Sequence, residues 1–235
     1  VTLTDAIFDA NTSGNFGGGL ANVYGGTVKI ASADFTNNSA NNAGGAIFNG
    51  IDKNYGSVEE GEDSTNHGII VISGENNFIG NSAGEFGGAI YSDGGTITLS
   101  GTNVFSGNTA NGKANDIHNL GTLNISGDLT LDGGITGTGT VKFNGGSLTT
   151  ALNNLTALIS AGTVTGETSL VIDNGVTNAS LIMFDKEQSG FNFANNALYT
   201  IKDDNGDGIY TITKKSTSEE VEVLKRADEV FKKIK

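Results

Sequence analysis

One stretch of the sequence decides the fold: Phe35-Thr36-Asn37-Asn38-Ser39-Ala40-Asn41-Asn42-Ala43-Gly44-Gly45-Ala46-Ile47. It contains a Phe, an Asn three residues later, a hydroxyl residue and a small residue after that, and then a Gly-Gly-Ala-Ile block. The same order of residue types returns near Phe8, Phe78 and Phe105. A fixed order of residue types that returns along a chain is the signature of a repeat architecture, so the whole sequence is aligned in this register.

Aligning the four phenylalanines also aligns the positions that follow them. The aligned sets are Phe8, Phe35, Phe78 and Phe105; Asn11, Asn38, Asn81 and Asn108; Thr12, Ser39, Ser82 and Thr109; and Leu20, Ile47, Ile90 and Ile117. Successive phenylalanines are separated by 27, 43 and 27 residues. The long step is therefore the same repeat with an insertion, at about residues 51–66.

The repeats predict a three-sided solenoid in which like positions stack at about 4.8 Å, the spacing of hydrogen-bonded strands. We expect the phenylalanines to form an inner stack and the asparagines to pass hydrogen bonds from amide to amide along one turn. This structural ladder comprises Phe35, Phe78, Phe105, Asn38, Asn81 and Asn108. The glycine block would permit positive φ and close approach between repeats at a corner. Replacing a ladder Asn by Ala in a middle repeat should destabilise more than an ordinary surface change.

Composition agrees with many short strands and excludes several other classes of protein. The chain has 36 Gly, no Pro and no Cys, which favours glycine turns and excludes a disulfide framework and thiolate metal sites. The net charge is −13, and the single arginine is Arg226. Without a cluster of Lys and Arg before the tail, the sequence predicts no binding to nucleic acid or to an anionic membrane. It also contains no apolar run long enough for membrane insertion.

The pairing of Phe-x-x-Asn, as at Phe35 and Asn38, with Gly-Gly-Ala-Ile at residues 44–47 carries a family resemblance. It resembles the repeats of chlamydial polymorphic outer-membrane proteins and of other β-helical autotransporter passengers, over about residues 1–119. The resemblance implies an all-β fold, a right-handed single-stranded parallel β-helix of the pectin-lyase-like solenoid type. It also implies a secreted virulence protein of the outer membrane and bacterial cell surface, an adhesin that binds a host or bacterial surface protein or glycan.

The second half of the chain keeps the strand rhythm without the full motif. We expect a β-helix over residues 1–215, with regular repeats at 1–119, degenerate coils at 120–197 and a hairpin at 198–213. The run Ser180-Leu181-Ile182-Met183-Phe184 is taken as one of the degenerate coils. Apolar residues at helical spacing predict an amphipathic C-terminal α-helix at 216–235. That helix would cap the open end of the solenoid, or else contact a partner helix or lead towards an anchor.

Strand alternation indicates a candidate ligand-binding site. If the aliphatic column that contains Ile47 faces inward, the next residue of each repeat faces outward. The outward residues Phe48, Tyr91 and His118 would then form an exposed aromatic stripe, suited to stacking on a sugar or a protein. The alternative is that the stacked rings only reinforce the sheet.

The insertion carries a second candidate site. Glu59, Glu60, Glu62 and Asp63 form an acidic loop with His67 just behind it, which could clamp a cation or contact a basic partner. Loops inserted in solenoids often form binding surfaces. A solvated acidic loop without a ligand is the alternative.

The second half of the chain carries a candidate calcium site. Asp203-x-Asn205-x-Asp207 has the oxygen spacing of the first half of a calcium loop. The position where that loop would place its closing glutamate is Lys214, so a hairpin turn without a cofactor is favoured.

The β-helix fold also occurs in polysaccharide lyases and hydrolases, so catalysis needs separate consideration. A glycosidase needs two carboxylates across a cleft, whereas Asp34, Asp93 and Asp116 lie in different columns or at corners of the predicted repeats. We therefore expect no catalytic residue and a structural or adhesive shaft. The alternative is a β-helix that binds or degrades polysaccharide.

Overall fold

The computed structural model describes residues 1–51, 67–151, 157–173, 178–186, 188–194, 198–203 and 205–215. These residues form 23 strands and no helix, and most strand pairs in the three larger sheets are parallel. The predicted all-β character is therefore confirmed. The expected helix at 216–235 and nearly all of the insertion at 51–66 lie outside the described residues.

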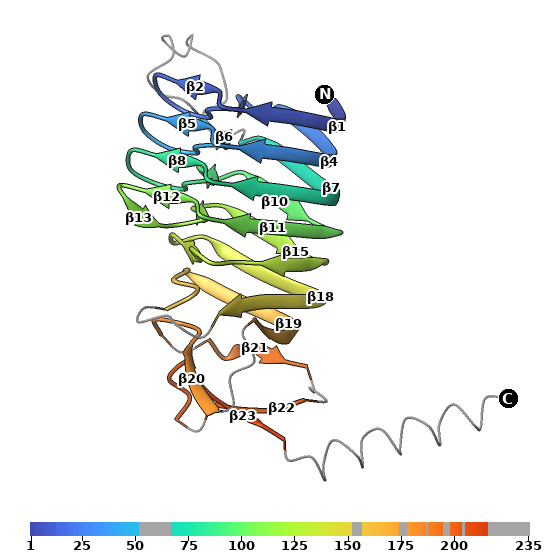
Figure 1. Ribbon diagram of the computed structural model, residues 1–235, viewed down its shortest axis with the longest axis vertical. Coiled ribbons are helices and arrows are strands. Elements are labelled where there is room, and N and C mark those ends of the chain that lie inside the picture. The colour runs from blue at the N-terminus through green and yellow to red at the C-terminus, as the bar shows by residue number, and fades with distance from the viewer. Residues whose placement is uncertain are drawn as a thin grey trace, which may run out of the picture.

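Strands of three sheets alternate along the first half of the chain, so that each of the first four repeats contributes to all three. Sheet 1 contains β1 (Thr2–Asp9), β4 (Thr27–Thr36), β7 (Ile69–Ile79), β10 (Thr96–Leu99), β11 (Thr102–Ser106), β15 (Thr122–Ile125), β16 (Asp128–Thr130), β18 (Thr140–Ala151), β19 (Thr163–Asp173) and β21 (Gly190–Phe193). Sheet 2 contains β2 (Thr12–Ser13), β5 (Ser39–Ala40), β8 (Ser82–Ala83), β12 (Thr109–Ala110) and β13 (Lys113–Ala114). Sheet 3 contains β3 (Leu20–Val23), β6 (Ile47–Gly50), β9 (Ile90–Ser92), β14 (Ile117–Asn119) and β17 (Ile135–Thr136). Successive repeats lie one above the other from the N-terminal end downwards (Figure 1).

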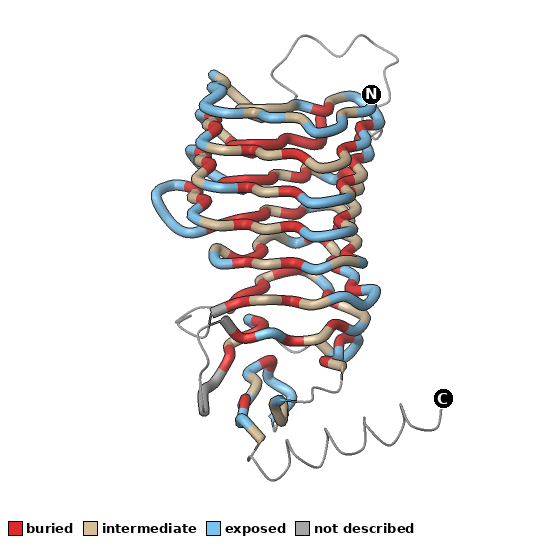
Figure 2. Tube along the Cα trace, turned by 45° about the vertical axis from the view of Figure 1, so that its right-hand side comes forward, coloured by how far each residue is buried: buried red, intermediate tan, exposed pale blue. Residues whose placement is uncertain are grey.

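The strand register reproduces the alignment of the phenylalanines. Phe8 pairs with Phe35, Phe35 with Phe78, and Phe78 with Phe105. Their rings stack at centroid distances of 4.6, 5.0 and 4.5 Å and are nearly parallel. Phe35, Phe78 and Phe105 are fully buried, and buried positions recur at the same place in successive repeats (Figure 2). The prediction of a contiguous inner stack is confirmed.

The predicted asparagine ladder is also present. Asn38 donates from Nδ2 to Oδ1 of Asn81 at 3.0 Å, and Asn81 donates in the same way to Asn108 at 3.0 Å. The second Nδ2 hydrogen of Asn81 reaches the carbonyl oxygen of Phe35, and Oδ1 of Asn81 also accepts the backbone N–H of Asn38. All three asparagines are fully buried. Because buried amides must find partners, each repeat is held to the next in a single register.

The glycine block marks a corner where the backbones of successive repeats nearly touch. A Cβ atom at Gly45 would lie 2.1 Å from the carbonyl oxygen of Gly88, and one at Gly18 would lie 2.2 Å from that of Gly45. Gly44 in addition has a φ of +68°, in the left-handed region. Both expected reasons for glycine therefore apply, at adjacent positions of the block.

The second half continues sheet 1 and then changes. β15 pairs in parallel with β18, and β18 with β19. The sequence-based assignment of Ser180 to Phe184 to a further parallel coil is only partly right. β20 (Asn178–Ile182) pairs antiparallel with β23 (Ile209–Lys214), which also forms the predicted hairpin with β22 (Tyr199–Lys202). The end of this run still continues the sheet 3 column, through a parallel bridge between Phe184 and Ile159. The hairpin supplies a strand that runs against β20, and this fourth sheet ends the stack (Figure 1).

Candidate functional site

The outward neighbours of the sheet 3 aliphatic column form one file, here called the outer column: Ala21, Phe48, Tyr91 and His118. The rings of Phe48 and Tyr91 stack at 5.7 Å, and those of Tyr91 and His118 at 5.5 Å. Phe48 is only 1% exposed, so the prediction of an exposed stripe is wrong for this residue. The reason is that the rings lie face to face along the stack and cover one another. Tyr91 and His118 keep partial exposure.

Two further aromatic residues belong to this site. Phe16 stacks on Phe48 at 4.6 Å, and Phe86 lies 4.6 Å from His118 and 6.3 Å from Tyr91. Phe86 is 45% exposed and is the most accessible ring of the group. Sequence reasoning missed both residues, although a signal exists. Each immediately precedes the double glycine of its repeat, at the position where the second repeat has Ala43, and parallel bridges align the three.

The rings of the outer column are uncharged at neutral pH. Burial raises the pKa of Tyr91 to about 12, and the nearby carboxylates of Asp93 and Glu85 add to the shift. Burial also lowers the pKa of His118, whose Nδ1 lies 2.8 Å from Oγ1 of Thr136. The imidazole is therefore placed as an aromatic member of the stack and not as a cation.

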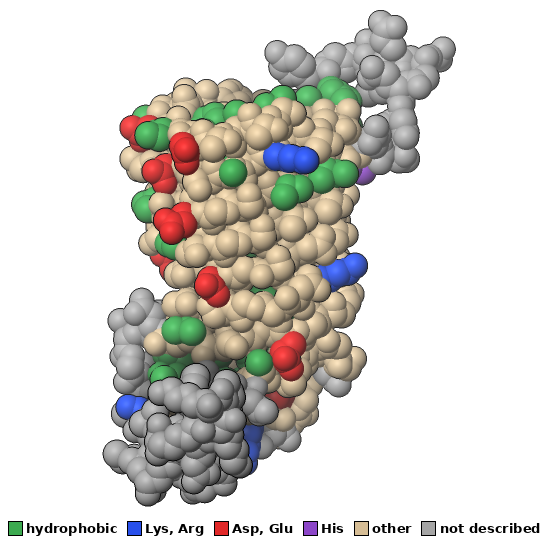
Figure 3. Space-filling view, turned by 90° about the vertical axis from the view of Figure 1, so that its right-hand side faces the viewer, with side chains coloured by type: hydrophobic (Ala, Val, Ile, Leu, Met, Phe, Trp, Pro, Cys, Tyr) green, Lys and Arg blue, Asp and Glu red, His purple; other side chains and the backbone are tan. Residues whose placement is uncertain are grey.

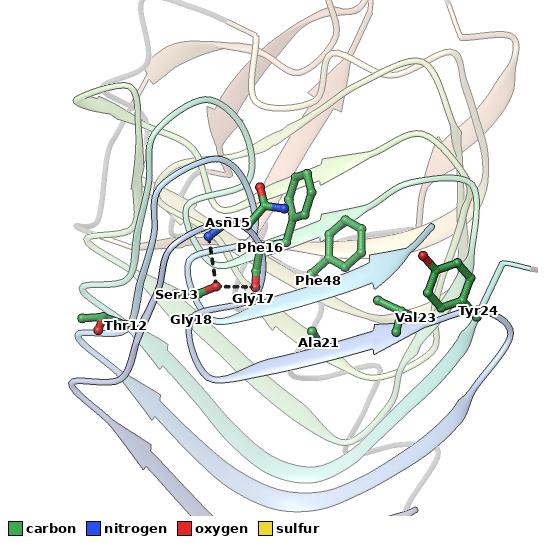
Figure 4. A pocket seen from close by; sticks show the side chains of 10 residues that line it. All are labelled: Thr12, Ser13, Asn15, Phe16, Gly17, Gly18, Ala21, Val23, Tyr24 and Phe48. Atoms are coloured by element: carbon green, nitrogen blue, oxygen red, sulfur yellow. Dashed lines mark hydrogen bonds between the residues drawn. The ribbon is translucent and has the colours of Figure 1, made fainter. Parts of the chain in front are cut away.

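At the first repeat the outer column carries Ala21 in place of a ring, and a hollow of about 410 Å³ lies there. Phe16 and Phe48 line it together with Val23 and Tyr24 (Figure 4). The polar and glycine residues that complete the lining are Thr12, Ser13, Asn15, Gly17 and Gly18.

The acidic loop of Glu59, Glu60, Glu62 and Asp63 lies outside the described residues, so its role stays a prediction. His67, just behind it, is described and lies over Gly94, where a Cβ atom would be 2.5 Å from the imidazole Cε1. Within the described part of the chain, Nδ1 of His67 is buried and has no hydrogen-bond partner.

The turn between β22 and β23 uses its carboxylates to hold the backbone. Oδ1 of Asp203 accepts the N–H groups of Gly206 and Asp207, and Oδ2 accepts that of Gly208. Oδ1 of Asp207 accepts the N–H of Ile209. These contacts agree with the hairpin-turn interpretation of the Asp203-x-Asn205-x-Asp207 motif. Among the residues that the structure describes, no group of three or more His, Cys, Asp or Glu side chains is arranged to hold a metal ion.

The three repeat-region aspartates that were weighed as catalytic acids occupy different surroundings. Asp34 is on sheet 1, where its Oδ1 accepts Nδ2 of Asn77 at 2.7 Å. Asp93 lies beyond β9, beside Gly50. Asp116 is fully buried at the end of the asparagine ladder. The structure thus does not bring them together as a pair across a cleft.

Comparison with protein families, with curated proteins and with solved structures finds no match. Within the described ranges, no helix is long and apolar enough to cross a membrane.

Proposed function

We propose that the chain is a right-handed single-stranded parallel β-helix that serves as the shaft of a bacterial surface protein. In this proposal it is an extracellular, adhesin-type passenger domain that attaches to a host cell or a neighbouring cell. Support for the β-helix comes from the way each of the first four repeats adds strands to three sheets in turn. The handedness follows from the strong preference for right-handed connections between parallel strands.

The observation that carries the proposal is the unbroken stack of like residues. The Phe8, Phe35, Phe78 and Phe105 rings and the asparagine ladder join each repeat only to its neighbours. A chain that stacks in this way gains length with each repeat, as a shaft requires. The buried asparagines of the ladder hold successive repeats together, which suits a structural role.

The surface suits contact with a partner that is neither nucleic acid nor an anionic membrane. The chain has a net charge of −13. On the face in Figure 3, acidic side chains are scattered along the stack and basic ones are few. We propose that the partner is a protein or a glycan on another cell, because a negatively charged surface does not repel these. The partly exposed rings of Phe86 and Tyr91 could contact such a partner.

The test is adhesion of the whole chain. Beads that carry the folded protein should bind cultured epithelial cells or bacterial cells saturably, and excess soluble protein should compete. Beads that carry the heat-unfolded chain are the matched control and should not bind. Equal binding by folded and unfolded chains would contradict adhesion. Release of reducing ends or unsaturated products from a panel of polysaccharides would instead favour the enzymatic alternative.

A further inference from the structure

We infer that the hollow beside Ala21 binds a neutral sugar ring in contact with Phe16 and Tyr24. This inference deepens the proposed surface function and rests on it, because it assigns a ligand class to one cavity of the shaft. Three features of the molecule support it in three steps: the missing ring of the outer column, the backbone of Tyr24, and the chemistry of the lining.

The first step is that the outer column has a ring-sized gap. Phe48, Tyr91 and His118 are in register with Ala21. The first repeat therefore has a methyl group at the position where each of the next three repeats has a ring. Phe16 already covers Phe48, at 4.6 Å, and the cavity of about 410 Å³ opens beside it over the exposed Ala21. In Figure 4 the Phe48 ring lies between those of Phe16 and Tyr24, and Val23 lies between Ala21 and Tyr24. A flat ligand can therefore occupy the place that the sequence leaves without a ring.

The second step is that Tyr24 is held in a backbone conformation that tyrosine disfavours. Its φ is +53°, the next residue, Gly25, has φ of +76°, and the N–H of Gly26 donates to the carbonyl of Val23 at 3.4 Å. Two positive φ values in succession are those of a type I′ turn, whose first central position favours Asn, Asp or Gly. Folding alone would be served better by one of those residues. Residues with a strained backbone of this kind cluster at ligand sites, and Tyr24 lines the cavity.

The third step is the chemistry of the lining. The lining residues include no carboxylate, ammonium, guanidinium or imidazole group. Hydrogen bonds fix the wall that carries Phe16, because Oγ of Ser13 donates to the carbonyl of Phe16 at 2.8 Å and accepts the N–H of Asn15 at 3.3 Å. Aromatic rings present an apolar face to the C–H groups of a pyranose, and hydroxyl groups such as that of Thr12 suit its hydroxyl groups. An anionic sugar would meet no compensating cation here, so the ligand class is neutral.

The experiment is saturation-transfer NMR on the full chain with defined oligosaccharides. The neutral probes are maltotriose, cellotriose and N,N′-diacetylchitobiose, and 3′-sialyllactose is the anionic probe. We expect saturation transfer to at least one neutral probe. Ala21→Phe should place a ring in the gap and reduce that affinity by about tenfold or more, while the thermal midpoint stays the same or rises. Ala21→Ser is the matched control, and it should bind as the unsubstituted chain does.

Tyr24 gives an independent pair of variants. Tyr24→Asn relieves the backbone and removes the ring, so the thermal midpoint should rise while binding of the neutral probe falls. Tyr24→Phe keeps the ring and should retain most of the binding. Transfer to no neutral probe, transfer to sialyllactose alone, or binding unchanged by both Ala21→Phe and Tyr24→Asn would overturn the inference. If the beads adhere to cells but the chain binds no sugar, only the inference is contradicted. If the chain binds sugar but the beads do not adhere, only the proposed function is contradicted.

Discussion

Asn108 donates from Nδ2 to Oδ1 of Asp116 at 2.9 Å, and this contact ends the asparagine ladder in a carboxylate. The other carboxylate oxygen of Asp116 accepts the backbone N–H groups of Gly133 and Gly134 at 2.7 and 3.1 Å. Every amide of the ladder donates in the same direction along the stack. The last member must therefore accept on both sides. A carboxyl group can do so because each of its two oxygens carries lone pairs, whereas the NH₂ group of an amide carries none.

Asp116→Asn should destabilise the protein although the two side chains have the same shape. The amide would have to turn its NH₂ group either towards Nδ2 of Asn108 or towards the two glycine N–H groups, and both are donors. We expect a loss of about 1–3 kcal/mol in the free energy of unfolding, measured by urea denaturation at pH 8.

Asp132→Asn is the matched control for this substitution. Oδ2 of Asp132 also accepts a backbone N–H, that of Gly107, but the side chain is exposed, so water can replace the lost acceptor. Its effect should be within about 0.5 kcal/mol. An equal effect of the two variants would mean that the end of the ladder has no special requirement for a carboxylate.

The buried Asp116 should also make stability depend on pH. Burial raises the pKa of its carboxyl from 3.8 to about 7. The hydrogen bonds from Asn108 and the glycine N–H groups act in the opposite direction, and the nearby charge of Asp132 adds to the rise. The folded state therefore holds the proton more tightly than the unfolded chain. The stabilisation is complete below about pH 4 and is lost as the pH rises to about 7.

The measurement is the free energy of unfolding between pH 4 and pH 8 for the unsubstituted chain minus that for Asp116→Asn. The subtraction removes the titration of the other carboxylates. The difference should fall with rising pH and level off above about pH 7, with a slope of at most about 1.4 kcal/mol per pH unit. A difference that is flat, or that rises with pH, would contradict a raised pKa.

Much of the fold could be predicted because the repeats place identical residue types at identical distances. The pairing of Phe35 with Phe78 follows directly from the alignment, since a slip by one residue would turn every inner side chain outward. The glycine corner was predictable for the same reason. The antiparallel pairing of β20 could not be predicted, because residues 178–182 alternate as any strand does. The strand with which β20 pairs, and the direction of that pairing, depend on β23, which is distant in the sequence.

The candidate site was predictable only in its register. Alternation correctly placed Phe48, Tyr91 and His118 in one file, but exposure depends on how the rings are turned and on what neighbouring repeats add. The position of Phe16 over Phe48 comes from a loop residue outside the strand pattern. Likewise, the gap at Ala21 becomes visible only when the column is known to be aromatic in the other repeats.

The buried position of Phe48 predicts that it acts mainly in packing. Phe48→Ala should lower the free energy of unfolding by about 3–5 kcal/mol, because a fully buried ring between Phe16 and Tyr91 is lost. Phe86→Ala is the comparison, since that ring is 45% exposed and its loss should cost far less. Thermal and urea unfolding of both variants provide the measurement. If Phe48→Ala were as mild as Phe86→Ala, the ring would be exposed in solution and the stripe would again be a candidate platform.

Close approach at the glycine corner can be tested separately from backbone conformation. Gly45 does not have a positive φ, so Gly45→Ala adds only a Cβ atom. That atom would lie 2.1 Å from the carbonyl oxygen of Gly88 and 2.5 Å from that of Ser82, both backbone atoms of the next repeat. We expect a loss of about 3 kcal/mol or more in the free energy of unfolding, or failure to fold.

Gly14→Ala is the control, because Gly14 is exposed, has no positive φ, and would have no heavy atom within 4 Å of an added Cβ. It should change stability by less than about 1 kcal/mol, and in the stabilising direction, since alanine restricts the unfolded chain. Urea denaturation followed by circular dichroism compares the two. If both variants were equally stable, the repeats could not be in contact at this corner, and the tight stacking that underlies the shaft would be wrong there.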